Sequence, residues 1–378
     1  MPFTGRAIYD NGVMTGVAED VSDLISMISP FETPLLAALG DAPYPARSVL
    51  HEWLEDSLGP NTIVGSAAIT STTVDTQIGI AGGLATFLQV GAILRGPEAS
   101  GAEYFQIIAI AGNTITVSRA FGGTVANSVA VGASYSVIGD TALDGADVTV
   151  DTSRPRTRKT NYTMIVKKDV IISGTVRAVS MLGGITDEWD HQVQKKTREV
   201  LRDLEKQVIL SRLSGNTIGS ASAYRTMAGL LQQITTNVDS WGTLTAENLT
   251  QSVKKAWDQG GTDVNLIVCG DTIKHTVDGF NNTRIQTVQG TGQEGVYTEL
   301  VSVFECTYGS LPLLLTRWMP PNRFAIIATP RVRVMPLQGR SFQFQPVAQT
   351  GDATKGMLLG EYTMEVLNQE GMVQGKVV

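Results

Sequence analysis

The stretch ITDEWDHQVQKKTREVLRDLEKQVILSRLSGN, residues 185–216, predicts a long helix around which the rest of the chain is organised. Its apolar side chains recur at steps of three, four or seven residues, which aligns them along one side of a helix. They are Trp189, Val193, Val200, Leu204 and Val208. Thr186 is a suitable N-cap and Gly215 a suitable stop, so we expect a helix over 186–213, roughly 40 Å long.

The other side of this predicted helix is charged. It carries Lys195, Arg198, Glu199, Arg202 and Lys206. A helix of this length with one apolar side either lies across a sheet or acts as a strut. We expect the apolar side to pack on a sheet of the same subunit.

Composition limits the classes of protein to which the chain can belong. Its 378 residues predict two or three domains, and 42% hydrophobic residues allow sizeable cores. The net charge of −7 excludes a general nucleic-acid binder, which needs a basic footprint, but allows a container that tolerates nucleic acid.

Cysteine content and hydropathy indicate the compartment. Cys269 and Cys306 lie in apolar runs and read as buried small hydrophobes, so a disulfide framework is not expected. The N-terminus has no signal-peptide pattern, and no apolar run reaches membrane-spanning length. We expect a soluble protein made in a reducing cytoplasm.

The first sixty residues predict an arm followed by a strand. Residues 1–47 read as an extended arm with an amphipathic helix at 17–28 that Pro30 stops. Residues 48–60 read as a strand whose partner lies far downstream at 158–166. This pairing predicts a long hairpin that is interrupted at its tip.

Residues 62–140 interrupt that hairpin and differ in composition from the rest of the chain. They contain six charged residues and no lysine, and Thr, Ser, Val, Ile, Ala and Gly dominate. Gly112-Asn113 between two alternating runs predicts a tight hairpin, and 88–94 and 134–138 read as further strands. We expect a small inserted all-β barrel or sandwich.

The remainder of the chain reads as an α+β region. A helix at 245–259, a buried strand at 264–269 and a short helix that Asp271 caps come first, and strands dominate later. The later strands are predicted at 299–304, 311–315, 324–327, 332–336 and 360–367.

A search for catalytic residues, cofactor ligands and metal ligands identifies none. The three histidines, His51, His191 and His275, fall in three different predicted elements, and no cysteine pair or H-E-x-x-H pattern offers a metal site. Neither G-x-S-x-G nor S-x-x-K occurs in a context that supports a serine nucleophile.

Three further patterns favour structural interpretations. Residues 290–295 match G-x-G-x-x-G, but a strand rather than a helix is predicted after them, so we expect a glycine loop. Asp144, Asp147 and Asp151 lack the spacing of a calcium loop. The basic cluster at 154–159 indicates a solvated loop or an ion-pair partner for another subunit, with phosphate contact as a minority interpretation.

The order of these elements resembles the major capsid proteins of tailed bacteriophages, which have the Hong Kong 97-type fold. The stretches that carry the resemblance span nearly the whole chain outside 62–140. They are SPFETP at 29–34, HEW at 51–53, DSL at 56–58, RKTNY at 158–162, SGT at 173–175, RWMP at 317–320 and GEYT at 360–363.

The resemblance implies a layout of five parts. These are an N-terminal arm at 1–47, an extended β hairpin loop at 48–61 and 141–175, the inserted β domain at 62–140, a peripheral domain at 176–229 and 346–378 with its spine helix at 186–213, and an axial domain at 230–345. The covalent Lys–Asn cross-link of some members cannot be assigned to residues here.

The resemblance also implies a function in assembly. The chain would form pentamers and hexamers of an icosahedral shell around double-stranded DNA, as a virion protein without enzymatic activity or cofactor. Scaffold, decoration and portal proteins are possible partners, DNA would be contacted weakly and non-specifically, and no membrane is involved. Candidate inter-subunit contacts are Phe31, Pro34, Trp53, Arg154, Arg156, Arg158, Lys159, Arg198 and Arg202.

Two other functions compete with this one. An encapsulin-like shell of a cellular compartment has the same fold but encloses enzymes. An enzyme or sugar-binding protein would use the β insert as its working domain, although the insert has few aromatic side chains for stacking on a sugar.

Overall fold

The computed structural model describes most of the chain. The described residues are 31–40, 42–70, 76–147, 151, 153–179, 187–213, 215, 219–220, 222–281, 303–349 and 351–378. The predicted helix at 17–28, the N-cap Thr186 and the loop at 290–295 lie outside them. The chain divides into two compact units, which we call the framework (Met1–Glu52 with Thr160–Val378) and the insert unit (Trp53–Lys159).

The predicted long helix is α3, Glu188–Leu210, in the framework. Asp187 is its N-cap, and the carboxylate of Asp187 accepts a hydrogen bond from the amide of Trp189 at 2.8 Å. The helix ends three residues before the predicted Leu213, because Ser211 is already extended and its carbonyl accepts the amide of Gly229. Val200, Leu204 and Val208 of the predicted apolar stripe are buried.

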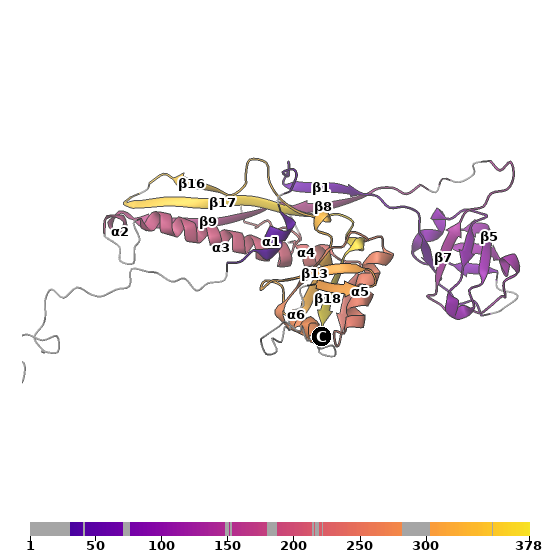
Figure 1. Cartoon of the computed structure of the whole chain (residues 1–378). Coiled ribbons are helices and arrows are strands. Elements are labelled where there is room, and N and C mark those ends of the chain that lie inside the picture. The colour runs from indigo at the N-terminus through magenta and orange to yellow at the C-terminus, as the bar shows by residue number, and fades with distance from the viewer. Residues whose placement is uncertain are drawn as a thin grey trace, which may run out of the picture. The chain divides into compact units, whose positions relative to one another are not determined.

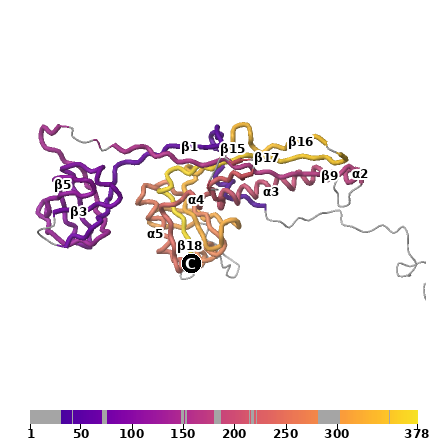
Figure 2. The backbone as a smooth tube through the Cα atoms, turned by 180° about the vertical axis from the view of Figure 1, so that it is seen from behind, coloured from indigo at the N-terminus to yellow at the C-terminus, as the bar shows by residue number. Residues whose placement is uncertain are grey.

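A long sheet lies against this helix (Figures 1 and 2). Its central strand β17, Ala353–Val366, pairs antiparallel with β9, Met164–Ser173, along one edge. Along its other edge it pairs with β16, Gln343–Val347, and β15, Val332–Pro336. Alternate side chains of β9 are buried beneath α3, so the apolar side of the helix packs on a sheet of its own subunit, as expected.

Aromatic packing fixes the first turns of α3 on this sheet. Trp189 meets Phe344 edge to face, with ring centroids 5.7 Å apart. Gly356 of β17 lies directly beneath them. A Cβ at position 356 would collide with the Phe344 ring and stand 3.1 Å from Trp189, so glycine is required there by close approach rather than by backbone conformation.

A second sheet forms the other part of the framework. Its strand order is β10-β18-β14-β11-β13-β12, and α5, Ala246–Asp258, and α6, Asp271–Asp278, lie beside it (Figure 1). The strands are β10 Val238–Trp241, β11 Leu266–Cys269, β12 Val303–Cys306, β13 Gly309–Leu315, β14 Arg323–Ile327 and β18 Val373–Val377. Three short helices complete the framework: α1 Pro34–Leu39, α2 Gly174–Ala178 and α4 Leu230–Gln233.

Three predictions for this region differ from the structure. The stretch 346–378 does not rejoin the long sheet as a whole, because the chain reverses at Asn368, where φ is 47°, and β18 then pairs with β10 and β14. Conversely, β15, which was predicted to lie in the axial domain at 230–345, pairs with β17 of the long sheet. Asp271 is not a helix cap: Gly270 occupies that position and Asp271 begins the helix.

The strands of the insert unit close on themselves. Their order is β2-β7-β4-β5-β6-β3, and the bridge from Gly65 to Ile80 joins the two outer strands. The strands are β2 Thr62–Val64, β3 Gln77–Gly79, β4 Ile93–Arg95, β5 Tyr104–Ala111, β6 Thr114–Ser118 and β7 Ser134–Gly139. Between the predicted alternatives of barrel and sandwich, the structure is a small barrel with its own apolar core.

The hairpin at Gly112-Asn113 is confirmed, with β5 and β6 on either side of it. The strand predicted at 88–94 is wrong over most of its length. A 3₁₀ segment, Ala81–Phe87, precedes it, and Gly91 with φ of 94° interrupts the extended backbone, so only Ile93–Arg95 is a strand. An apolar run by itself does not distinguish these conformations.

The predicted pairing of the strand at 48–60 with the strand at 158–166 is confirmed. Strands β1, Leu50–Glu55, and β8, Thr157–Tyr162, form a two-stranded sheet, which we call the ribbon. Among the described residues, no third strand joins the ribbon. None of the helices in the described part of the chain is long and apolar enough to cross a membrane.

Candidate functional site

The N-terminal arm is fastened to α3 by a buried carboxylate. Glu205 lies on α3 with no exposed surface. Its Oε1 accepts the amide of Leu35 and its Oε2 accepts the amide of Leu36, both at 2.8 Å. These amides begin the short helix α1 of the arm, where no intrahelical acceptor is available to them. We call this contact the arm anchor.

The arm anchor holds its charge in an apolar setting. Leu35, Val208 and Ile209 belong to the same buried cluster, and among the described residues Glu205 accepts from the amides of Leu35 and Leu36 without an ion pair. Burial raises the pKa of the Glu205 carboxyl, and the hydrogen bonds from Leu36 and Leu35 offset only part of that effect. In the part of the chain that the structure describes, the polar part of the anchor therefore consists of two amide donors.

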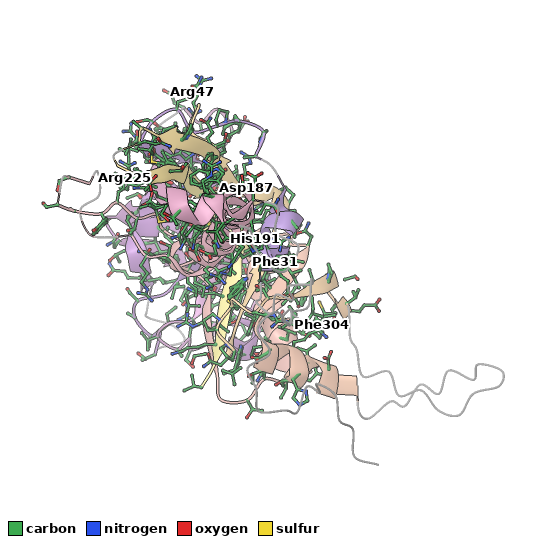
Figure 3. All side chains as sticks on the ribbon, turned by 90° about the vertical axis from the view of Figure 1, so that its left-hand side faces the viewer. Phe31, Arg47, Asp187, His191, Arg225 and Phe304 are labelled. Atoms are coloured by element: carbon green, nitrogen blue, oxygen red, sulfur yellow. The ribbon has the colours of Figure 1, made fainter. Side chains whose placement is uncertain are left out.

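Weaker contacts surround the arm anchor. The Arg198 guanidinium lies 5.1 Å from the centre of the Phe31 ring, and the Lys206 ammonium lies 4.4 Å from the Trp318 ring. The indole Nε1 of Trp318 donates to the carbonyl of Glu32 at 2.9 Å, and Arg317 pairs with the Glu32 carboxylate at 3.1 Å. Figure 3 looks toward the Asp187 end of α3 and labels Phe31.

A second site lies on β17, where three alternate side chains are polar and buried: Glu361, Thr363 and Glu365. Glu361 accepts a hydrogen bond from the Thr163 hydroxyl at 2.6 Å. It also forms ion pairs with Arg225 and with Arg340, the latter at 2.9 Å. One buried carboxylate thus joins three segments that are far apart in the sequence.

Glu365 connects the arm to the base of the ribbon. Its Oε2 accepts a hydrogen bond from the Tyr44 hydroxyl at 3.2 Å and lies 3.2 Å from Nε2 of His51. Arg333 donates to Tyr44 at 2.6 Å and lies 3.7 Å from the other carboxylate oxygen. We call the row of Glu361, Thr363 and Glu365 with these partners the polar junction. It sets the points from which the arm and the ribbon leave the long sheet.

Arg154 and Arg156 of the basic cluster at 154–159 already have interaction partners within the insert unit. The Arg154 guanidinium lies 4.7 Å from the Phe87 ring and donates to the Leu58 carbonyl at 2.7 Å. Arg156 pairs with Asp56 at 3.5 Å, with both side chains mostly exposed. Arg158 and Lys159 lie on β8.

The other predicted contact residues fall in two places. Phe31 is half exposed beside Arg198, and Pro34 is the first residue of α1. Trp53 lies on β1, where its indole donates to the Glu55 carboxylate at 3.0 Å. Arg202 is half-buried on α3, its Nε 3.8 Å from Asp203, and that nitrogen makes no hydrogen bond. The structure therefore places Phe31 beside Arg198, Pro34 on the arm and Arg202 on α3, and it places Trp53, Arg158 and Lys159 on the ribbon.

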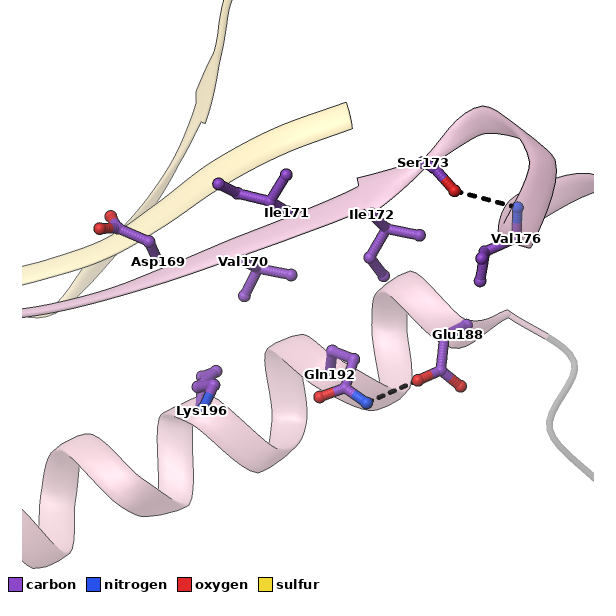
Figure 4. Close-up of a pocket in the computed structure, with 9 residues that line it drawn as sticks. All are labelled: Asp169, Val170, Ile171, Ile172, Ser173, Val176, Glu188, Gln192 and Lys196. Carbon is purple, nitrogen blue, oxygen red and sulfur yellow. Dashed lines mark hydrogen bonds between the residues drawn. The ribbon is translucent and has the colours of Figure 1, made fainter. Parts of the chain in front are cut away.

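A cavity of about 330 Å³ lies between the first half of α3 and β9 (Figure 4). Val170 and Ile172 are among its apolar lining residues, and Glu188, Gln192 and Lys196 line it from α3. Gln192 donates to Glu188, and Lys196 pairs with Glu199 at 2.8 Å, so these polar groups already satisfy one another. No metal-binding group of three or more His, Cys, Asp or Glu occurs among the described residues.

One S-x-x-K spacing does occur, from Ser252 to Lys255 on α5. Ser252 has no exposed surface, and its hydroxyl donates to the buried Asp239 at 2.5 Å while accepting from the Trp241 indole at 3.3 Å. Lys255 pairs with the same Asp239. The arrangement connects α5 to β10. The Ser252 hydroxyl is buried and hydrogen-bonded, so a substrate could not reach it.

The arm anchor and the polar junction were missed from the sequence. A signal for Glu205 exists, since it stands between Leu204 and Val208 at the edge of the apolar stripe. Glu361 and Glu365 alternate with apolar residues, a pattern that ordinarily indicates a solvated face. Most of their partners, such as Thr163 and Tyr44, are more than a hundred residues away, so no local pattern could identify them.

Comparison with known proteins adds the family. The model of a family described as SU10 major capsid protein matches residues 6–377 of the chain. A search of curated proteins found no match to the chain.

Solved structures supply the fold. The capsid of cyanophage A-1(L) is similar with a TM-score of 0.52 and 10% identity, over 96% of this chain and 97% of that one. The capsid of the Myoviridae phage XM1 gives a TM-score of 0.50 at 10% identity, over 95% and 97%. An encapsulin complex from Synechococcus elongatus gives 0.43 at 10% identity, over 58% and 75%.

Proposed function

We propose how the subunits of this chain, which belongs to the SU10 major capsid protein family, assemble into a shell. The chain is the major capsid protein of a tailed phage and a component of the virion. Copies form pentamers and hexamers that close into an icosahedral shell around double-stranded DNA. The fold is of the Hong Kong 97 type.

The observation that supports this assembly most strongly is the number of surfaces that the subunit leaves unfinished. The ribbon has two strands, too few for independent stability in water, and it exposes Leu54, with Leu58, 90% exposed, just beyond it. Strand β9 pairs only along its β17 edge among the described strands, and it exposes Ile165 and Ile171 on one face. Open edges and apolar faces of this kind are covered by partner chains.

We assign the inter-subunit contacts to two groups of side chains. Arg202 lies on α3 with 26% of its side chain exposed, whereas Arg198 serves chiefly the arm of its own subunit through Phe31. The ribbon contributes Trp53, Arg158 and Lys159, and Arg156 lies just before β8. The neighbouring subunit would supply carboxylates and apolar side chains against them, since the chain is acidic overall.

The layout in five parts remains our proposal, adjusted to the strand pairing. Residues 1–47 form the arm, 48–61 and 141–175 the extended loop, and 62–140 the inserted domain. The peripheral domain holds α3 with β9, β15, β16 and β17, and the axial domain holds the second sheet, which includes β18.

We propose that the protein is not an enzyme and that its other partners are those of a shell. A scaffold, a portal and a decoration protein would bind assembled subunits, and packaged DNA would touch the inner surface weakly. A net charge of −7 supports only weak DNA contact, because binding to phosphates requires clustered cations. An encapsulin-like compartment is the alternative, and the contents of purified particles distinguish the two.

Expression of the full chain, with a scaffold protein if one is required, tests the assembly. Sedimentation and negative-stain microscopy should show closed particles or capsomers. Arg202→Glu should reduce particle yield more than it destabilises the subunit, whereas Lys254→Glu, which reverses a charge on the exposed face of α5, should assemble normally. A parent chain that stays monomeric under all conditions would contradict the proposal.

A further inference from the structure

The barrel of the insert unit carries two β-bulges on either side of one strand. On β5, the pairing with β6 shifts between Ile107 and Ala109, which leaves Ile108 without a partner. On β7, the pairing with β4 shifts between Val137 and Gly139, which leaves Ile138 without a partner. Bulges redirect side chains, and they recur where a surface is used for binding.

Both bulges turn an isoleucine outward. Ile108 and Ile138 are each 55% exposed, whereas their neighbours Ile107 and Val137 face the barrel core. Strand β4 lies between them and places the half-buried Ile93 on the same outer face, opposite Gln106. Val90 follows at the adjoining turn, where the Gly91 amide donates to the Ile107 carbonyl. We call Val90, Ile93, Ile108 and Ile138 the isoleucine patch.

The surroundings of the isoleucine patch carry little charge. Arg95 is the nearest charged residue along β4, and it pairs with Glu98. Asp140 is exposed two residues beyond Ile138, next to Thr141, whose amide donates to the Gly91 carbonyl. The other described ion pair of the barrel, Glu103 with Arg119, is buried. A nucleic acid would be repelled by Asp140, whereas a second apolar surface would fit the four side chains of the patch.

The area of the isoleucine patch indicates which kind of partner can bind it. Four side chains of this kind cover less than the roughly 800 Å² that each partner contributes to a stable interface between free proteins. Such a contact forms when another interaction already holds the two surfaces close, because tethering raises their effective concentration to about the millimolar range. Copies of one chain in a shell meet this condition, and a freely diffusing protein does not.

We propose that the isoleucine patch binds the insert of a second copy of this chain within the assembled shell. The contact adds stability to the particle and is too weak to join free subunits. The inference rests on the proposed assembly, because only the shell supplies the tethering.

Cross-linking in particles tests the proposal. The full chain with Ile108→Cys and Ile138→Cys is assembled, checked by microscopy, and treated with a short bismaleimide. The control is Val131→Cys, 65% exposed beside the opposite end of β7, and the parent chain gives the background from Cys269 and Cys306. Ile138→Cys alone serves if the double variant fails to fold.

We expect covalent dimers several-fold above the control in particles and none above background in free subunits at the same concentration. Intact particles in which the patch cysteines link no better than position 131 overturn the proposal. So does protection of these cysteines in virions without links between copies, which would assign the patch to a separate protein. If the parent chain forms no particles, the proposed assembly itself has failed, and this outcome is seen before any cross-linker is added.

Discussion

Two buried carboxylates, Glu103 of the insert unit and Glu205 of the framework, show how differently the two units are held together. Each accepts two backbone amide hydrogen bonds near 2.8–2.9 Å. Only Glu103 also has an arginine, Arg119, which donates to it at 2.7 and 3.1 Å. The pKa of Glu103 is lowered, because hydrogen bonds and the charge of Arg119 outweigh the effect of burial, whereas the pKa of Glu205 is raised.

The difference indicates that the barrel is self-contained and that the arm is conditionally attached. Glu103 closes a polar network inside a barrel that already has its own apolar core. Glu205 holds the arm through two hydrogen bonds, next to Leu35, the buried side chain of α1, and exposed side chains surround this contact. In a shell protein, an arm that can leave its own subunit can exchange partners during assembly.

The largest effect should come from the polar junction of the framework. Glu361→Ala leaves Arg225 and Arg340 without their shared carboxylate, and we expect it to lower the free energy of unfolding of the framework by about 3–5 kcal/mol. Denaturant unfolding measures this, and Glu98→Ala, which removes an exposed ion pair, is the control. A loss no larger than that of the control would refute the role assigned to the junction.

Glu103→Ala should have a comparable but confined effect. The substitution removes the carboxylate partner of the buried Arg119 side chain. It should destabilise the barrel by about 3 kcal/mol, while the framework unfolds as before. A probe in each unit follows the two transitions separately. If both transitions shift together, the barrel is not self-contained.

The two carboxylates should respond oppositely to pH. Glu103, with its lowered pKa, stabilises the fold above the ordinary value of 4.5, and this contribution is lost as pH falls through its folded pKa. Glu205, with its raised pKa, contributes stability that is present below 4.5 and lost as pH rises through its folded pKa. The arm should therefore be held less firmly at neutral than at mildly acidic pH.

Hydrogen exchange at the amides of Leu35 and Leu36, corrected for intrinsic rates, measures this attachment. Protection should fall as the pH rises through the raised pKa of Glu205, from mildly acidic to neutral conditions. Glu205→Gln should remove the pH dependence and keep the protection near its mildly acidic level, because the uncharged carboxamide mimics the protonated carboxyl and does not titrate over this range. A variant that keeps the parent's pH profile would assign the dependence to another group.

The smallest effect concerns the contacts at the edge of the arm anchor. Arg198→Ala removes the guanidinium from the exposed Phe31 ring and should weaken arm attachment by about 0.5–1 kcal/mol. The same exchange experiment detects it, and Arg198→Lys should retain part of the attachment. An unchanged arm in Arg198→Ala would mean that Arg198 faces a neighbouring subunit instead.

Local patterns predicted the elements, and contacts between distant residues decided what these elements do. The long repeat of α3, the hairpin at Gly112-Asn113 and the helix predicted at 245–259, which is α5, were predicted correctly, because each depends on residues within a few positions of one another. The polar junction and the arm anchor depend on pairs that only the fold brings together, such as Leu35 with Glu205. The reversal at Asn368 required a left-handed residue that is not glycine, which the sequence does not mark.

A reconstruction of particles assembled from the full chain tests the central claim most directly, because the account assigns neighbouring copies to surfaces that one subunit leaves open. We predict a closed shell in which a neighbouring copy lies against Arg202 of α3, along the open edge of β9 and against the ribbon. A closed shell in which α3, β9 and the ribbon all face solvent would contradict the account, as would a chain that forms no shell.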